Sequence, residues 1–511
     1  MMNRQSKIST ILPKYLGTFL IVVGMFLVTC SKEVKDDPAG TVLAQVGSRV
    51  ITVQDFIRRS EFSLRPDFCA GSSNIHKKIV LNNLIAEKIL SLEEGKDSSL
   101  DTSKAIQAYL KGQSEQAMRQ WLFSERAVKK VIMNEEEVHR QARIASRSYS
   151  IQYFTSSDTA IVNRGHKALN EGKNIYMTYL AIFNAERVPQ KTLSWFDDEE
   201  PMVHQAFFSK QLKKGDILSP FMTLGGSTLF AQIVETTDDR LISGREFESH
   251  LSLVREKMKL RMAISIHDEI SKSLMRGQEF LMNEPVFLIY AQSLASHFFQ
   301  SAQDKKELFN AEVWNVERSN GDKDLSSKPQ ITDYETLFTL NGEPWTMGQF
   351  KHVIQRHPLV YRNRDMAYSD FPQQLKFAIA DLLLDLELTE MAYESSYNQV
   401  PSVTQYVELW EDQIRSSHYR SNYLKRVIPE FEYDSINRDI ILNDYLRPLI
   451  DSLQSAYSDQ IHIDMKEFDK IQLLRTPAIA TRENVPFPLY VPSFPVYTNE
   501  HRIDYGSIGV N

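Results

Sequence analysis

One short pattern occurs twice in this chain, and it constrains the fold more than any other feature of the sequence. The first copy, at residues 46–56, reads VGSRVITVQDF, and the second copy, at residues 340–350, reads LNGEPWTMGQF. Each copy is typical of a short strand, a glycine turn and a threonine that can cap a helix, with a phenylalanine closing the motif. Long amphipathic helices are predicted after both copies. The sequence therefore predicts two related helical modules rather than two catalytic centres.

The helices predicted after the two copies also correspond to each other. In the first module, apolar residues recur at steps of three and four within residues 79–92, and a further helix is predicted for residues 102–131. In the second module, residues 371–392 and 403–427 show the same kind of pattern. We therefore expect a mainly helical chain, and its length implies two to four domains.

The first 29 residues are predicted to be a lipoprotein signal peptide. Three basic residues precede an apolar run at 16–28, which is short for a spanning helix and is followed at once by Cys30. The ending Leu-Val-Thr-Cys resembles a bacterial lipobox, so Cys30 is the predicted lipidation site; the alternative is an uncleaved signal anchor. Residues 30–40 suit a tether between lipid and folded body. The lack of an Asp directly after Cys30 favours the outer membrane over the inner membrane.

Charge and composition exclude several classes of function. The chain has 59 basic and 66 acidic residues, and loss of the three basic residues in the signal peptide leaves a net charge of −10. Such an acidic chain is not expected to bind nucleic acid, which needs a basic face. The sequence has no phosphate-binding loop, no dinucleotide fingerprint and no Cys or His pairs at metal-binding spacing. We therefore predict no cofactor, no metal and no nucleotide.

The pattern changes in the middle of the chain. A strand at 149–154, a helix at 158–172 and two strands at 220–224 and 228–234 predict a small α+β domain. A long helix of mixed charge is expected to follow it. The predicted organisation is a signal peptide at 1–29, a tether at 30–40, a first helical module at 41–146, the α+β domain at 147–244, a long helix and return segment completing the first module at 245–315, a linker at 316–334, a second helical module at 335–472 and a proline-rich, poorly packed extended tail at 473–511.

This arrangement resembles the periplasmic foldases of the SurA and PrsA type, with the α+β domain similar to a parvulin prolyl isomerase. The resemblance covers about residues 35–275 and, more loosely, 335–470. The segments that carry it are 46–47, 51–52, 56, 80–85 and 134–138 in the helical part, and 193–196, 212–220 and 223–226 in the parvulin-like part.

The resemblance also indicates where the chemistry has changed. An active parvulin usually places a histidine on its first strand and another on its last strand, facing across the substrate proline. The matching positions here are Ser150 and Thr228, so we expect an inactive domain and name no catalytic residue. The family's peptide-binding positions are matched by Met202 and two neighbouring phenylalanines. The candidate peptide-binding residues are Trp195, Phe196, Met202, Phe207 and Phe208.

The resemblance implies a lipid-anchored chaperone in the periplasm of a Gram-negative bacterium, attached at the outer membrane. Its expected partners are unfolded or nascent outer-membrane and secreted proteins, together with the membrane reached through the N-terminal lipid. Two alternatives stay open at this point. One is an active peptidyl-prolyl cis-trans isomerase, and the other is a structural lipoprotein of an envelope assembly complex.

Overall fold

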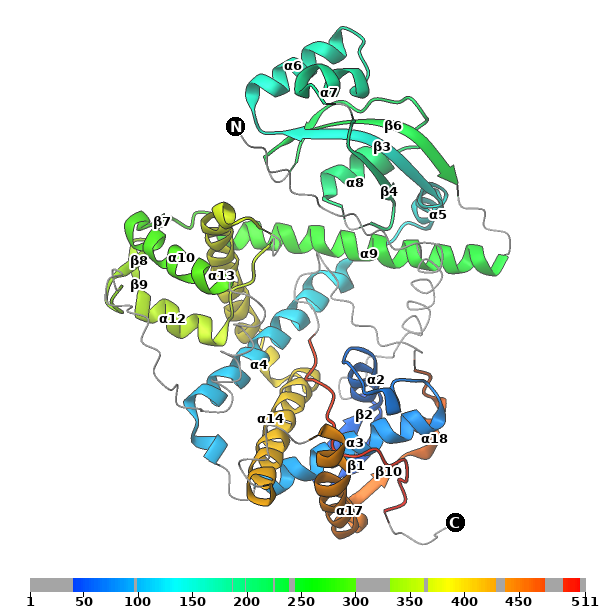
Figure 1. The fold of residues 1–511 in the computed structure, drawn as a ribbon, viewed down its shortest axis with the longest axis vertical. Coiled ribbons are helices and arrows are strands. Elements are labelled where there is room, and N and C mark those ends of the chain that lie inside the picture. Colours follow the sequence, from blue (N-terminus) through cyan, green and yellow to red (C-terminus); the bar gives the residue numbers. More distant parts are fainter. Residues whose placement is uncertain are drawn as a thin grey trace, which may run out of the picture. The chain divides into compact units, whose positions relative to one another are not determined.

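The fold is described from a computed structural model of the chain (Figure 1). It describes residues 40–95, 99–185, 187–197, 199–223, 226–238, 244–299, 331–362, 366–428, 437–473 and 490–505. The predicted signal peptide, Cys30 and the tether up to residue 39 lie outside the described residues, as does most of the predicted linker.

The chain forms two compact units. One, here called the α+β unit, is built from residues 127–265, and the other, here called the helical unit, from residues 36–126, 266–481 and 486–511. The prediction of a mainly helical chain with a small α+β domain is confirmed. No described helix is both long enough and apolar enough to cross a membrane.

The repeated motif forms the same structure twice in the helical unit. Each copy is a β-hairpin followed directly by a helix. The elements are β1 (Val42–Val46), β2 (Arg49–Thr52) and α2 (Val53–Glu61) in the first copy, and β8 (Thr336–Leu340), β9 (Glu343–Thr346) and α12 (Met347–Arg356) in the second.

The caps and turns of the two copies correspond residue by residue. The side chains of Thr52 and Thr346 each cap their helix by accepting a hydrogen bond from the backbone amide three residues later. The side chains of Asp55 and Gln349 in turn accept a hydrogen bond from the backbone amide of the capping threonine. Gly47 adopts a φ of +56° in the first hairpin turn, a conformation that glycine reaches without steric cost. The duplication predicted from the sequence is therefore a duplication of local structure.

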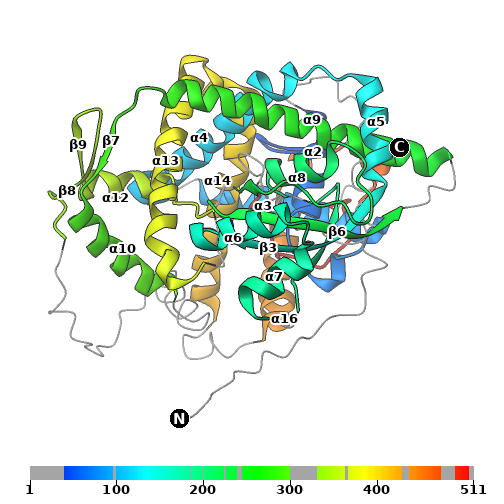
Figure 2. The same cartoon turned by 90° about the horizontal axis from the view of Figure 1, so that it is seen from above.

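A third strand completes each hairpin: the first hairpin is joined by a strand that lies far from it, towards the C-terminal end of the chain, and the second by a strand that precedes it in the same half of the chain. Strand β10 (Ile461–Ile463) pairs antiparallel with β1, and strand β7 (Phe280–Met282) pairs antiparallel with β8. The two sheets have the orders β10-β1-β2 and β7-β8-β9. Figure 2 shows the second sheet grouped with its helices α10 (Glu284–Phe298) and α12.

This pairing corrects the predicted organisation. The return segment was expected to complete the first module, but its strand β7 pairs with β8 of the second module. Residues 285–289, expected as a returning strand or a core segment, form no strand but begin helix α10, where Phe287 belongs to the core. The physical reason is that both hairpins offer an equivalent edge, so the apolar pattern alone does not say which edge a strand joins.

Long helices make up the rest of the helical unit. Helix α3 packs along α14, and α4 packs against α13 and α14. Their bounds are α3 Asn74–Glu94, α4 Lys104–Arg126, α13 Phe371–Glu394, α14 Pro401–Val427, α17 Arg447–Ala456 and α18 Met465–Lys470. The predicted helix at 102–131 thus ends at Arg126.

The described part of the C-terminal tail, residues 490–505, contains neither helix nor strand, yet it is well packed. Phe494, Tyr497 and Thr498 are buried, the last completely. The expectation of a poorly packed tail is therefore wrong for this part. Side chains of α3 supply hydrogen bonds to its main chain, which a proline-rich segment cannot obtain from a sheet.

The α+β unit contains one antiparallel sheet in the order β4-β3-β6-β5. One sheet face packs on α5, α8 and α9, and the other contacts α6 and α7. The bounds are α5 Glu135–Ala145, β3 Arg147–Ser156, α6 Thr159–Asn170, α7 Ile175–Phe183, β4 Gln190–Ser194, α8 Pro201–Phe208, β5 Phe221–Met222, β6 Thr228–Asp238 and α9 Gly244–Met275.

Candidate functional site

The two positions assigned to the family histidines lie far apart on the sheet. Ser150, in β3, is level with Thr192 of β4 and with Glu235 of β6. Thr228 begins β6 and is level with Ser156 at the other end of β3. Six residues of extended strand separate the two levels, a distance of about 20 Å. The structure does not bring Ser150 and Thr228 together, and the four strands contain no histidine.

The surroundings of Ser150 are those of a solvated strand surface. Its hydroxyl lies 3.3 Å from the hydroxyl of Thr192 on the neighbouring strand. The structure thus places a hydroxyl, which is not a base that activates a nucleophile, beside Ser150.

Trp195 is the centre of the site, and its position is fixed by hydrogen bonds. The ring is almost completely buried, and its indole N–H donates to Oε1 of Gln141 at 3.0 Å. Its carbonyl oxygen accepts from Nε2 of His204 at 3.1 Å and from the guanidinium of Arg261 at 3.0 Å. The same guanidinium stacks 4.5 Å from the indole centroid, a favourable cation–π geometry.

The other predicted peptide-binding residues divide into buried and accessible side chains. Phe207 and Phe208 belong to the core of the α+β unit, and Phe208 contacts Tyr149 with ring centroids 5.4 Å apart. Phe196 is half-buried and lies edge-on to Trp195. Met202 is exposed. Burial therefore excludes Phe207 from direct contact with a peptide, and Phe208 remains available only where it borders a pocket.

A pocket of about 260 Å³ lies between α5, α8 and α9, within the α+β unit. Most of its lining is apolar, and the apolar residues that line it are Trp195, Phe208, Met258 and Met262. Its polar lining consists of Arg140, Gln141, His204, Gln205, Ser209 and Arg261. A hollow of this size accommodates one large side chain, not a folded partner. Met258 and Met262 are not among the residues predicted from the sequence, because they lie in the long helix α9, whose charged residues interrupt the apolar pattern.

His204 forms one wall of this pocket in its neutral form. Burial, and then the positive charge of Arg261, lower its pKa from the ordinary 6.5 to about 4. Because Nε2 faces a carbonyl oxygen, it must carry the proton and donate it, which leaves Nδ1 as the unprotonated nitrogen. His204 is thus a fixed hydrogen-bonding group at neutral pH rather than a proton carrier.

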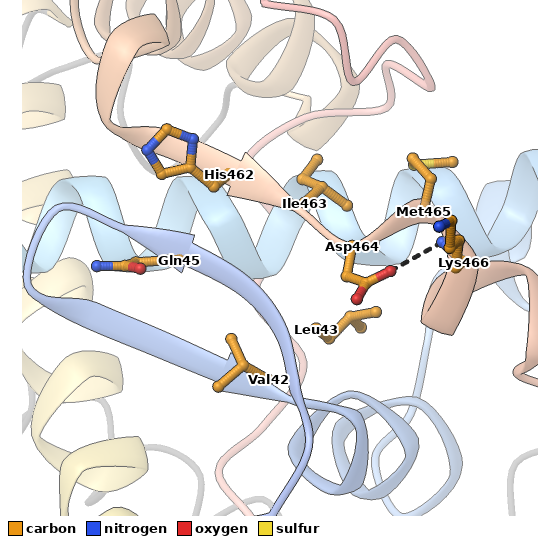
Figure 3. A pocket seen from close by; sticks show the side chains of 8 residues that line it. All are labelled: Val42, Leu43, Gln45, His462, Ile463, Asp464, Met465 and Lys466. Atoms are coloured by element: carbon orange, nitrogen blue, oxygen red, sulfur yellow. Dashed lines mark hydrogen bonds between the residues drawn. The ribbon is translucent and has the colours of Figure 1, made fainter.

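A second hollow, of about 590 Å³, lies in the helical unit where β10 leads into α18 (Figure 3). Its lining is evenly polar and apolar, and its central carboxylate belongs to Asp464. That carboxylate accepts from the amides of Lys466 and Glu467 at 2.9 and 3.0 Å, so it serves as the N-cap of α18. The oxygen Oδ1 of this carboxylate therefore serves the local structure of the helix start.

Metal and thiol chemistry find little support in the described residues. No three His, Cys, Asp or Glu side chains in the described ranges converge in a way that could hold a metal ion. Burial raises the pKa of Cys69 to about 12, so its thiol stays protonated and unreactive.

Comparison with known proteins gives one structural match. No protein-family model matches the chain, and no curated protein matches it. A crystal structure of the foldase protein PrsA from Lactococcus lactis matches over 46% of this chain and 93% of its own length, at 12% sequence identity and a TM-score of 0.19. A TM-score this low means that the two backbones do not superpose, so the match decides neither fold nor function.

Proposed function

We propose that this chain is a lipid-anchored cell-envelope chaperone that holds unfolded outer-membrane or secreted proteins, and that its parvulin-like domain does not catalyse proline isomerisation. The observation that carries the proposal is the pocket formed by Trp195, Phe208, Met258 and Met262. It offers an apolar surface to a side chain and contains no acid–base pair.

The lining suits weak binding of many sequences. Methionine is unbranched and polarisable, so Met258 and Met262 can adapt their shape to different side chains. The wall formed by Trp195 is rigid, because four hydrogen-bonding and stacking contacts hold it. A shallow adaptable pocket on a rigid base binds without demanding one residue type, as a holding chaperone requires.

The arrangement of the sheet supports the proposed loss of isomerase activity. Rotation about a peptide bond has a barrier of about 18–20 kcal/mol, and a catalyst must stabilise the twisted amide in a shaped, dry pocket. Ser150 lies on a strand surface about 20 Å from Thr228, and none of the four strands contains a histidine. His204 and His250 lie on helices and each donate to a backbone carbonyl instead.

The test compares two methionines of the same unit. Replacing Met262, which is partly exposed in the pocket, with lysine should weaken binding of a chemically unfolded client at least fivefold. Replacing Met222, which is exposed outside the pocket, with lysine is the matched control and should change nothing. Suppression of client aggregation is the readout. Equal protection by the two variants would show that the pocket is not the binding site.

Two further measurements separate the alternatives. A protease-coupled peptide assay should show no acceleration of proline isomerisation, and turnover in that assay would instead identify an active isomerase. Stable co-purification with one envelope complex, without suppression of aggregation, would identify a structural lipoprotein. Membrane attachment is supported only by the sequence at Cys30, and replacing Cys30 with alanine should release the protein from the membrane fraction.

A further inference from the structure

The described tail, residues 490–505 and here called the tail segment, lies against α3 and α14 of the helical unit (Figure 1). What distinguishes the contact is that side chains of the helices hydrogen-bond to the main chain of the tail segment. Asn83 of α3 makes three such bonds: its Oδ1 accepts from the amides of Tyr497 and Thr498 at 2.8 and 3.0 Å, and its Nδ2 donates to the carbonyl of Thr498 at 2.7 Å.

Three more side chains bind main-chain carbonyls along the same segment. Their contacts span the tail segment from its first described residue to residue 500. The guanidinium of Arg59 donates to Ser493 at 2.9 Å, Asn82 donates to Glu500 at 3.0 Å, and the hydroxyl of Tyr406 donates to Tyr490 at 2.9 Å. Bonds to peptide groups do not depend on the identity of the bound side chains.

Two aromatic side chains provide the specificity of the contact. Phe494 enters the apolar core around the first sheet, and Tyr497 enters a smaller cluster with Ala86, Leu90 and Ile450. The hydroxyl of Tyr497 also donates to Ser416 of α14 at 2.9 Å. The surface under the tail segment, formed by Arg59, Asn82, Asn83, Tyr406 and Ser416 and here called the groove, therefore contacts a peptide backbone together with two aromatic residues three positions apart.

The groove residues themselves are preorganised. Asn82, Asn83 and Arg59 are each at most 1% exposed. Arg59 is held by a bidentate pair with Glu87, at 2.9 and 3.0 Å, and Asn83 is held by a bond to the carbonyl of Ile79. Donors and acceptors that are held in place and bind main-chain groups are typical of a peptide-binding site. Preorganisation of this kind lowers the entropy lost on binding.

We propose that this groove is a second polypeptide-binding site, which the tail segment occupies as an internal substitute for a client. Its ligand is a non-native polypeptide segment with two aromatic residues at positions i and i+3, which displaces the tail segment. The site is separate from the pocket at Trp195, and the proposal depends on the proposed function only in taking unfolded chains as the displacing ligand.

The test uses the full chain with Phe494→Ala and Tyr497→Ala together, which weakens the tail segment but leaves the groove unchanged. A fluorescent peptide with the wild-type sequence of residues 490–505 should bind this variant at least tenfold more tightly than the wild-type chain. Adding Asn83→Ala to the variant should abolish that binding. A folded double variant that does not bind the peptide would show that the tail segment is only a structural brace and would overturn the proposal.

A second measurement needs no variant and covers the case in which the double variant does not fold. Hydrogen exchange of the amides of residues 496–500 in the wild-type chain should become at least threefold faster when the peptide is added in excess. Unchanged exchange at saturating peptide would overturn the proposal. Both measurements use a peptide rather than a client protein, so they can fail while suppression of aggregation at the Trp195 pocket succeeds, and the reverse also holds.

Discussion

Replacing Phe468 with alanine should loosen a sheet that begins more than 400 residues earlier in the chain. Phe468 lies in α18, directly after β10, and its side chain is completely buried. Its ring lies edge-on to Phe56 with centroids 6.0 Å apart, and the ammonium of Lys77 lies 4.8 Å from its centroid. It therefore anchors β10 and α18 to the first module.

The size of the effect follows from this burial. Truncating a fully buried phenylalanine to alanine costs about 3–5 kcal/mol, from lost apolar burial and the cavity that remains. Because about 1.4 kcal/mol corresponds to a factor of ten, local opening should become about two to three and a half orders of magnitude more frequent. Strand β1 loses its neighbour when β10 detaches, so the amides of residues 43–46 should report the opening by hydrogen exchange.

The second module provides a matched variant. Phe287 of α10 is the equivalent residue, since it is buried and follows β7. Phe287→Ala should accelerate exchange in residues 336–340 and leave residues 43–46 protected, while Phe468→Ala should do the opposite. If Phe468→Ala exposed β8 instead, or if each variant affected both sheets equally, the pairing of β10 with the first hairpin and of β7 with the second would be refuted.

Three further perturbations follow from close contacts. Gly112→Ala in α4 should destabilise the helical unit by about 2 kcal/mol in urea unfolding, because the added Cβ would lie 2.2 Å from the carbonyl oxygen of Arg356 and this outweighs the gain of about 1 kcal/mol in helix propensity. Glu87→Ala should cost about 3–5 kcal/mol in the same assay, because it leaves the guanidinium of Arg59 buried without its partner. Because the pKa of His204 falls from 6.5 to about 4 on folding, the unfolded chain binds more protons between these values, and the α+β unit should lose about 1–2 kcal/mol of stability as pH falls from 6.5 to 4.

Each of these perturbations has its own control. Gly244→Ala, at a glycine with no heavy atom within 4 Å of the added Cβ, should be neutral or slightly stabilising, and a similar loss at both glycines would contradict the packing argument. A double variant with Arg59→Met and Glu87→Leu should recover most of the stability lost in Glu87→Ala. His204→Gln should remove the loss of stability between pH 6.5 and 4, and an unchanged pH dependence would show that another group titrates there.

Local structure in this chain could be predicted well, because it depends on neighbouring residues. The capping threonines Thr52 and Thr346 and the apolar stripes of the long helices are encoded within a few residues. The packing of the tail could not be predicted, since its hydrogen-bonding partner Asn83 lies more than 400 residues away. The pocket was identified only in part for the same reason: Trp195 is one of the predicted residues, but its neighbours come from three helices.

The pairing of β1 with β10 limits the order in which the helical unit can fold. Strand β1 has both of its neighbouring strands only after β10 has been synthesised, so residues 42–46 cannot complete their pairing before residues 461–463 are present. Contacts this distant in sequence form slowly, because a long loop must close before they contribute any stability. The tail segment adds the same constraint, since it covers α3 from the C-terminal end. The first sheet of the helical unit therefore closes only after both ends of this unit are present, whereas the second sheet, formed by residues 280–346, can close without the first hairpin.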